Sequence, residues 1–325
     1  MKERAENLCL LIPVYDDWES VGRLLDEVDA ALAGRERGVR AVLVDDASST
    51  PCPAELVDRP LESIAEISVV ELRRNLGHQR ALAVGLAYVE DRVPCRAVLI
   101  MDGDGEDRPA DAAVLVDLLE RHGRGKTIFA RRARRSEDWW FKALYRIYIA
   151  MHRLLTGLWM DIGNFSIVPA AHLSRLVAVA ELWNHYAAAV VRARIPFDTV
   201  DTERGRRFAG ASKMNLPALI IHGLRAFSVY ADVVVVRLLI ASAVVLVLAL
   251  LGVLAVLVIR FATDLAVPGW ATYATGLLAV LVLQVATISI LVTFLLLVAP
   301  AASAFLPVRD YAYYVNGVEQ IAIPA

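Results

Sequence analysis

Two carboxylates, one residue apart, follow an apolar run of the sequence. Asp102 and Asp104 come directly after Val98-Leu99-Ile100-Met101, with Gly103 between them. The run predicts a buried strand, and the polar residues after it predict a turn. Carboxylate oxygens at this spacing suit Mg²⁺ or Mn²⁺, and a cation that keeps open positions can bind phosphates. Because Asp-x-Asp after a strand is more often an ordinary polar turn, the motif alone indicates little.

A second acidic strand end lies upstream. The β-rich run Ala41-Val42-Leu43-Val44 stops at Asp45 and Asp46. In open parallel sheets, ligands bind beyond the carboxyl ends of the strands. Two acidic strand ends in one sheet therefore favour a binding site over an accidental pairing of charges.

The elements that would position these residues alternate along the first 130 residues. Short aliphatic runs predict strands, and apolar residues at helical spacing between them predict amphipathic helices. We expect strands over 8–12, 41–44, 67–72, 97–101 and 127–130, and helices over 21–32, 81–89 and 112–119. This order predicts an α/β fold with a doubly wound, mostly parallel sheet. After residue 130 we expect a helix over 139–155 and a strand near 163–168.

Two long apolar segments lie in the C-terminal third. Residues 238–259 and 277–298 contain no charged residue, and each is long enough to cross a bilayer as a helix, which needs about 20 residues. Two buried core helices are the alternative. The segments lack the broken helices and midplane charges of transporters, so we interpret them as anchors in the lipid bilayer. Polar residues could pair helices within one chain or in a homo-oligomer: Gln284, Thr287 and Ser289.

The charges around these segments predict an orientation. The loop between them offers only Arg260 and Asp264, whereas many cations precede the first segment: Arg192, Arg194, Arg204, Arg206, Arg207, Lys213, Arg225 and Arg237. The positive-inside rule then places the first domain and both termini in the cytosol, at the inner membrane. The N-terminal apolar run, Leu8 to Val14, is too short for a signal peptide.

Charge and cysteine usage exclude other classes. The formal net charge of −2 gives no reason to expect a nucleic-acid partner. Cys9, Cys52 and Cys95 lack metal-binding or redox spacing, and we interpret them as packing residues.

Five segments in order resemble the family 2 glycosyltransferases, and among them the membrane-anchored polyprenyl-phosphate glycosyltransferases related to dolichyl-phosphate mannose synthase. They are Ile12-Pro13-Val14-Tyr15, Val44-Asp45-Asp46-Ala47-Ser48, Asn75-Leu76-Gly77-His78-Gln79-Arg80-Ala81-Leu82, Met101-Asp102-Gly103-Asp104 and Arg207-Phe208-Ala209-Gly210-Ala211-Ser212-Lys213. The resemblance covers roughly residues 8 to 230. It implies a cytosolic GT-A-type glycosyltransferase domain over 1–215, a juxtamembrane helix over 216–236, a two-helix anchor over 237–300 and a cytosolic tail over 301–325.

The resemblance also implies roles for individual residues. Pro13, Tyr15 and Asp46 would bind the nucleotide base and ribose. Asp102 and Asp104 would bind the metal and the diphosphate, and Gly103 between them would contribute to cofactor binding. Phosphates would be bound by Arg132, Arg207 and Lys213, with Arg131 as a neighbouring alternative to Arg132 and Arg135 sharing its role. The implied reaction is an inverting transfer from a nucleoside-diphosphate sugar to a polyprenyl phosphate, such as undecaprenyl phosphate, with Mg²⁺ or Mn²⁺ as cofactor.

Three alternatives stay open. One is a polysaccharide synthase, although the Gln-x-x-Arg-Trp element of those enzymes is absent. Another is a non-catalytic scaffold that binds a nucleotide sugar. The third is transfer to a hydroxyl of a lipid-linked saccharide, which needs a general base. We expect that base at Asp161 first, and otherwise at Glu181, His185 or Glu203.

One departure from the family bears on the acceptor. Many relatives carry Gly-Asp-Phe-Arg-Leu where this chain has Gly163-Asn164-Phe165-Ser166-Ile167. Asn164 cannot take a proton, which favours an acceptor that is already anionic. The sequence leaves open whether the donor carries uridine or guanosine, and which sugar is transferred.

Overall fold

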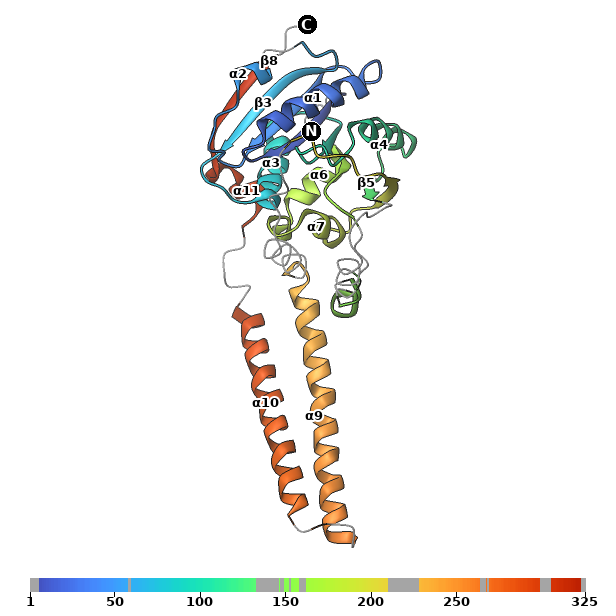
Figure 1. Ribbon diagram of the computed structural model, residues 1–325, viewed down its shortest axis with the longest axis vertical. Coiled ribbons are helices and arrows are strands. Elements are labelled where there is room, and N and C mark those ends of the chain that lie inside the picture. Colours follow the sequence, from blue (N-terminus) through green and yellow to red (C-terminus); the bar gives the residue numbers. More distant parts are fainter. Residues whose placement is uncertain are drawn as a thin grey trace. The chain divides into compact units, whose positions relative to one another are not determined.

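The computed structural model describes residues 6–57, 60–132, 146, 149–151, 153–157, 162–209, 228–263, 267, 269–298 and 305–322. The chain forms two compact units, shown in Figure 1. The first unit combines Met1–Arg146, Trp159–Val229 and Phe305–Ala325, and the second combines Ile147–Leu158 and Tyr230–Ala304. Asp161, Gly210 and Lys213 lie outside the described residues, as does most of the helix predicted over 139–155.

The first unit is built on an eight-stranded sheet with the order β7-β5-β6-β4-β1-β2-β3-β8. The four strands β4, β1, β2 and β3 run parallel to one another, β5 runs parallel to β7, and β6 and β8 are antiparallel to their neighbours. The predicted mostly parallel α/β sheet is confirmed. The strands are β1 (Leu8–Val14), β2 (Val39–Asp45), β3 (Ile64–Leu72), β4 (Ala97–Ile100), β5 (Thr127–Arg132), β6 (Ser166–Pro169), β7 (Phe197–Thr202) and β8 (Val315–Ala322).

Helices cover both faces of this sheet (Figure 1). Leu10 and Ile12 of β1 belong to the core cluster that includes α1 and α4, whereas Cys9 and Leu11 belong to the cluster that includes α3. Because both of its faces are covered, β1 is apolar throughout rather than alternating. The helices are α1 (Trp18–Leu32), α2 (Ala54–Val57), α3 (His78–Arg92), α4 (Pro109–Arg121), α6 (Ala170–Val177), η1 (Ala180–Trp183), α7 (Tyr186–Arg192), α11 (Pro307–Asp310) and η3 (Tyr311–Tyr313).

The segment after the second apolar helix is part of the first unit, where the sequence predicts a tail over 301–325. β8 pairs with β3 from Glu66 opposite Ala322 to Leu72 opposite Val315. The Trp183 ring contacts the Phe305 ring, with centroids 3.8 Å apart. β8 thereby covers the edge that β3 would otherwise expose.

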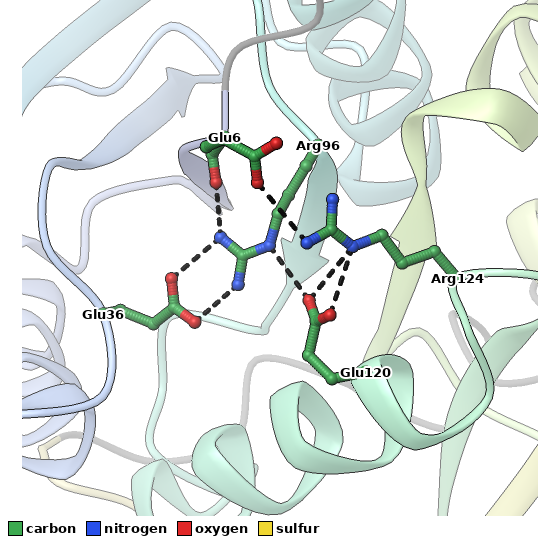
Figure 2. A network of polar contacts seen from close by, with 5 residues as sticks. All are labelled: Glu6, Glu36, Arg96, Glu120 and Arg124. Atoms are coloured by element: carbon green, nitrogen blue, oxygen red, sulfur yellow. Dashed lines mark hydrogen bonds and ion pairs between the residues drawn. The ribbon is translucent and has the colours of Figure 1, made fainter.

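An ion network ties the first unit together at the amino ends of its strands (Figure 2). The Arg96 guanidinium donates to the Glu36 carboxylate at 2.8 Å, to the Glu120 carboxylate at 3.2 Å and to the Glu6 carbonyl at 2.7 Å. Arg124 also donates to Glu120, at 3.1 Å. The Arg96 and Glu36 side chains are only 8% and 10% exposed. The network therefore joins segments that precede β1, β2 and β4 to the C-terminal end of α4.

The second unit contains two long apolar helices, α9 (Ala231–Ala262) and α10 (Trp270–Val298). Both are long and apolar enough to cross a membrane, and each extends beyond the segment predicted for it. Gly252 of α9 lies against Leu278 of α10. Thr287 and Ser289, predicted to pair helices, donate their hydroxyls to carbonyls of their own helix. Residues 231–236 of the predicted juxtamembrane helix belong to α9, and residues 216–227 lie outside the described residues.

Candidate active site

The two acidic strand ends meet at the carboxyl edge of the sheet, on either side of β1. The Asp46 amide donates to the Val14 carbonyl at 2.8 Å, and the Met101 amide donates to the Leu11 carbonyl at 3.1 Å. β1 lies between β2 and β4 in the strand order, so Asp46 and Asp102 emerge beside the end of β1. This is the edge at which such sheets bind ligands.

The acidic loop, residues 102–107, is held by its own carboxylates. Asp104 accepts a hydrogen bond from the Glu106 amide at 3.0 Å, and Asp107 accepts one from the Asp102 amide at 3.1 Å. A Cβ at Gly103 would lie 2.9 Å from a methyl group of Val21, so only glycine lets the loop approach α1 this closely. The Asp102 and Asp104 side chains remain 29% and 21% exposed, within reach of a ligand.

The groups around the acidic loop have opposing effects on the pKa of Asp104. Burial raises the pKa of the Asp104 carboxyl above its ordinary value, as do the neighbouring carboxylates of Asp102 and Glu106. The Glu106 amide and the Arg207 guanidinium lower it. Carboxylates this close together repel one another unless a cation neutralises them. Such a concentration of negative charge favours the binding of a metal ion.

A basic segment, residues 203–209, runs antiparallel to the acidic loop. Its backbone donates from Gly205 to the Glu106 carbonyl at 2.8 Å and from Phe208 to the Asp104 carbonyl at 3.0 Å. Arg204 forms two hydrogen bonds of 2.7 Å with the Glu106 carboxylate. The predicted Arg207 is thereby brought to the acidic loop, although 103 positions separate it from Asp104 in the sequence.

Arg207 is bound by two carboxylates. Its guanidinium lies 3.2 Å from an oxygen of Asp104 and 3.4 Å from an oxygen of Asp17, and it also donates to the Ala209 carbonyl at 3.1 Å. Asp17 is not among the residues predicted from the sequence, because an aspartate at the start of a helix is most often an ordinary N-cap.

Phe208 packs against the acidic loop at Gly105. Gly105 has a φ of +82°, and a Cβ there would lie 2.5 Å from the Phe208 ring. The guanidinium of Arg23 stacks on the Phe208 ring, 4.5 Å from its centroid. The glycine thus permits the close contact between the acidic loop and the basic segment.

Gly105→Ala should lower turnover by about tenfold or more, since the new methyl group displaces Phe208 and, with it, Arg207. A misplacement of about 1 Å can cost about a hundredfold in rate. Gly34→Ala is the matched control, because Gly34 has a φ of +73° but no atom within 4 Å of the place a Cβ would take. Both variants carry the backbone cost of about 1–2 kcal/mol. Steady-state rates and thermal unfolding of both variants test this, and equal rates in the two would contradict it.

A chain of side-chain amides reaches Asp102 from the other side. The Tyr186 backbone N–H donates to Gln79 Oε1 at 2.8 Å, and Gln79 Nε2 donates to Asn164 Oδ1 at 3.0 Å. Asn164 Nδ2 then faces His78 Nε2 at 2.9 Å and Asp102 Oδ1 at 3.5 Å. Since a backbone N–H can only donate, it fixes the direction of both amides. The departure at Asn164 therefore lies in the site and presents a donor to it.

The predicted nucleotide residues lie at the ends of β1 and β2. Tyr15 is 42% exposed, whereas Asp46 is only 2% exposed. The Asp46 carboxylate accepts hydrogen bonds from the amides of Leu76 and Gly77, at 2.6 and 2.8 Å. Burial raises the pKa of Asp46, while these two hydrogen bonds lower it. Asp46 thus holds the turn before α3, and its contact with the nucleotide stays a prediction.

Other predicted residues have partners that are not part of the acidic loop, although Arg108 directly follows it. Glu181 pairs with Arg192, Glu203 with Arg108, and Arg131 with Asp201. His185 caps α7 by accepting from the Ala188 amide. Arg132 ends β5, and its side chain lies outside what the structure describes, as do Asp161, Lys213 and Arg135.

The donor set suits a metal that other ligands complete. Among the described residues, no three side chains of His, Cys, Asp or Glu form a ready cage. Mg²⁺ is usually bound through one or two carboxylates together with substrate phosphates and water. Asp102 and Asp104 fit that arrangement.

The chain is similar in sequence to several known proteins. The chain is 34% identical over 118 residues to the dodecaprenyl-phosphate galacturonate synthase of Rhizobium johnstonii, covering 35% of this chain and 32% of that protein. It is 26% identical to the undecaprenyl-phosphate 4-deoxy-4-formamido-L-arabinose transferase of Serratia proteamaculans, covering 54% and 51%. It is 21% identical to the uncharacterized glycosyltransferase YkcC of Bacillus subtilis, covering 67% and 68%. The chain thus spans about a third to two thirds of these relatives.

Among solved structures, glucosyl-3-phosphoglycerate synthase from Mycobacterium tuberculosis, in complex with Mn²⁺, uridine diphosphate and phosphoglyceric acid, matches with a TM-score of 0.49. The match has 12% identity and covers 71% of this chain and 79% of that one. The model of the family described as "Glycosyl transferase family 2" matches residues 9–183, more than half of the chain. This range runs from β1 to η1 and includes the acidic loop, so the chain belongs to glycosyl transferase family 2.

Proposed function

We propose that the protein transfers a sugar, with inversion and metal dependence, from a nucleoside-diphosphate sugar to a polyprenyl phosphate such as undecaprenyl phosphate. The observation that supports this most directly is the acidic loop with Arg207 bound to it, in a chain that also carries two helices able to cross a membrane. The acceptors named for the galacturonate synthase and the arabinose transferase agree with it.

Different residues would bind different parts of the nucleotide-sugar donor. Pro13, Tyr15 and Asp46 would contact the base and ribose, as the family resemblance implies. Asp102 and Asp104 would hold Mg²⁺ or Mn²⁺, which supplies positive charge to the diphosphate. Arg207 would donate to the leaving diphosphate, and Arg132 and Lys213 would add cations. Charge-assisted hydrogen bonds of this kind strengthen as negative charge grows on the leaving group.

A lipid phosphate as acceptor needs no base. One of its anionic oxygens attacks the anomeric carbon while the bond from that carbon to the diphosphate breaks on the opposite face, which inverts the configuration. Glu181 and Glu203 form ion pairs with arginines, and His185 caps a helix, so each described candidate for a base already has a partner. Asn164 cannot serve as one. These observations support the phosphate acceptor, with Asp161 as the base if the acceptor is a hydroxyl.

The location follows from the same chemistry. A polyprenyl phosphate stays in the bilayer, so an enzyme acting on it gains from an anchor. The cations before α9 and their scarcity between α9 and α10 support a catalytic domain and termini on the cytosolic side of the inner membrane.

Turnover by the purified, detergent-solubilised protein tests the proposal. Uridine- and guanosine-diphosphate sugars are supplied with undecaprenyl phosphate and Mn²⁺ or Mg²⁺, and nucleoside-diphosphate release and glycolipid are measured. A glycolipid that forms with metal and is lost with EDTA is the expected result. Donor binding without glycolipid formation would indicate that the acceptor is a hydroxyl or that the protein is a non-catalytic scaffold.

A further inference from the structure

Arg207 lies where two carboxylates compete for it. One guanidinium nitrogen is 3.2 Å from Asp104 Oδ2, and another is 3.4 Å from Asp17 Oδ2. All three side chains are only 21–22% exposed, so solvent screens the pairs less than it would at an open surface. Arg207 thus bridges the acidic loop and the start of α1.

Asp17 departs from the usual behaviour of its position. It is the N-cap of α1, where an aspartate carboxylate normally accepts a hydrogen bond from the first turn of the helix. Within the described part of the chain, the Asp17 side chain makes no such capping bond. Its carboxylate pairs with Arg207 instead. Among the described residues, helix α1 thus lacks a side-chain cap, and its N-cap residue forms an ion pair instead. Departures of this kind from local preferences are expected at functional sites.

A metal ion and Arg207 cannot share Asp104 without cost. A divalent cation bound by the Asp104 carboxylate would stand a few Å from the guanidinium, and like charges at that distance repel strongly in a partly buried site. Metal binding must therefore weaken the contact between Arg207 and Asp104. The bond to Asp17 survives this, because it uses a different nitrogen.

We propose that Arg207 is the resident cation of the metal-free site, and that Asp17 is a positioning residue that retains Arg207 when a metal takes Asp104. This inference rests on the proposed metal-dependent function and adds a residue to it. Arg207 would give up one carboxylate to the incoming cation and stay beside the diphosphate through the other. Without Asp17, Arg207 would pair with Asp104 alone and compete more strongly with the metal.

Mn²⁺ binding to the detergent-solubilised full chain, without nucleotide, tests this. Free Mn²⁺ is followed by its electron paramagnetic resonance signal for the wild type, Arg207→Ala, Asp17→Asn and the double variant. We expect Arg207→Ala to bind Mn²⁺ about fivefold tighter and Asp17→Asn to bind it severalfold more weakly. In the Arg207→Ala background, Asp17→Asn should have little effect.

The double-mutant cycle separates this mechanism from simple charge effects. If Asp17 acted only as a distant negative charge, its loss would weaken Mn²⁺ binding equally with and without Arg207. Arg35→Ala controls for the removal of a cation from the first unit, because Arg35 pairs with Asp117 rather than with Asp104 and contacts neither Asp17 nor Phe208. Equal effects of Asp17→Asn in both backgrounds, or an Arg207→Ala variant that binds Mn²⁺ no tighter than wild type, would overturn the proposal.

The proposed function can fail separately. Glycolipid formation by the wild type, with no change in Mn²⁺ affinity in Arg207→Ala, would leave the function standing and remove the role of Asp17. If the Mn²⁺ affinities are as expected but the protein makes no glycolipid, the proposed function fails and the role of Asp17 stands.

Discussion

In the Asp104→Asn variant we expect kcat to fall by about a thousandfold while the protein stays folded. The amide keeps the shape of the side chain but loses the negative charge that would bind the cation. Metal stabilisation of a leaving group contributes several kcal/mol, and each 1.36 kcal/mol corresponds to about tenfold in rate. The fold should tolerate the change, because burial already raises the pKa of Asp104 and so disfavours its charged form.

The measurement is nucleoside-diphosphate release as a function of Mn²⁺ concentration, together with thermal unfolding of the same samples. Asp117→Asn is the matched control, since Asp117 is a half-exposed carboxylate of α4 that pairs with Arg35. A rate in Asp104→Asn equal to that of the control would remove the metal assignment.

The second large effect is on stability. Arg96→Ala should lower the free energy of unfolding of the first unit by about 3–5 kcal/mol, because it leaves the carboxylate of Glu36 buried without its main partner. Figure 2 shows that the same guanidinium also binds Glu120 and the Glu6 carbonyl. Removing one side chain therefore loosens the connections that precede three strands.

Denaturant unfolding in detergent, followed by tryptophan fluorescence, measures this loss. Arg92→Ala is a suitable control: the Arg92 side chain is 68% exposed and pairs with its neighbour Asp91, so its loss should lower the stability far less than the loss of Arg96. A double variant, Arg96→Met with Glu36→Leu, should recover much of the stability, because it removes both buried charges at once. A full loss in that double variant would show that packing, not charge, is responsible.

The sequence predicts well what depends on local pattern. β1 and β4 are continuous apolar runs because both of their faces are buried, and β2 is apolar from Ala41 to Val44, so the positions of these three strands follow from composition. The acidic ends of β2 and β4 then fall at one edge of the sheet, since parallel strands place their carboxyl ends together. The acidic loop is predictable in this way.

Contacts between segments that are far apart in the sequence are harder to predict from local pattern. β8 is a partly exposed strand with the sequence Val-Asn-Gly-Val-Glu-Gln-Ile-Ala, and only its pairing with β3 makes it a strand. The role of Asp17 depends on Arg207, which is 190 residues away along the chain. His78 Nε2 likewise lies 3.2 Å from an oxygen of Asp102, 24 residues away. An N-cap aspartate without the glutamate or glutamine three residues later that would complete a capping box is the one weak signal at Asp17.

The return of the chain to the sheet after α10 has a consequence for biosynthesis. Because β8 follows both apolar helices in the sequence, the ribosome completes the helices before it makes the last strand of the sheet. The edge of β3 therefore stays uncovered until the hydrophobic hairpin has already emerged. Completion of the sheet is thereby ordered after synthesis of the hairpin, so a chain released early would carry an exposed strand edge and an incomplete sheet.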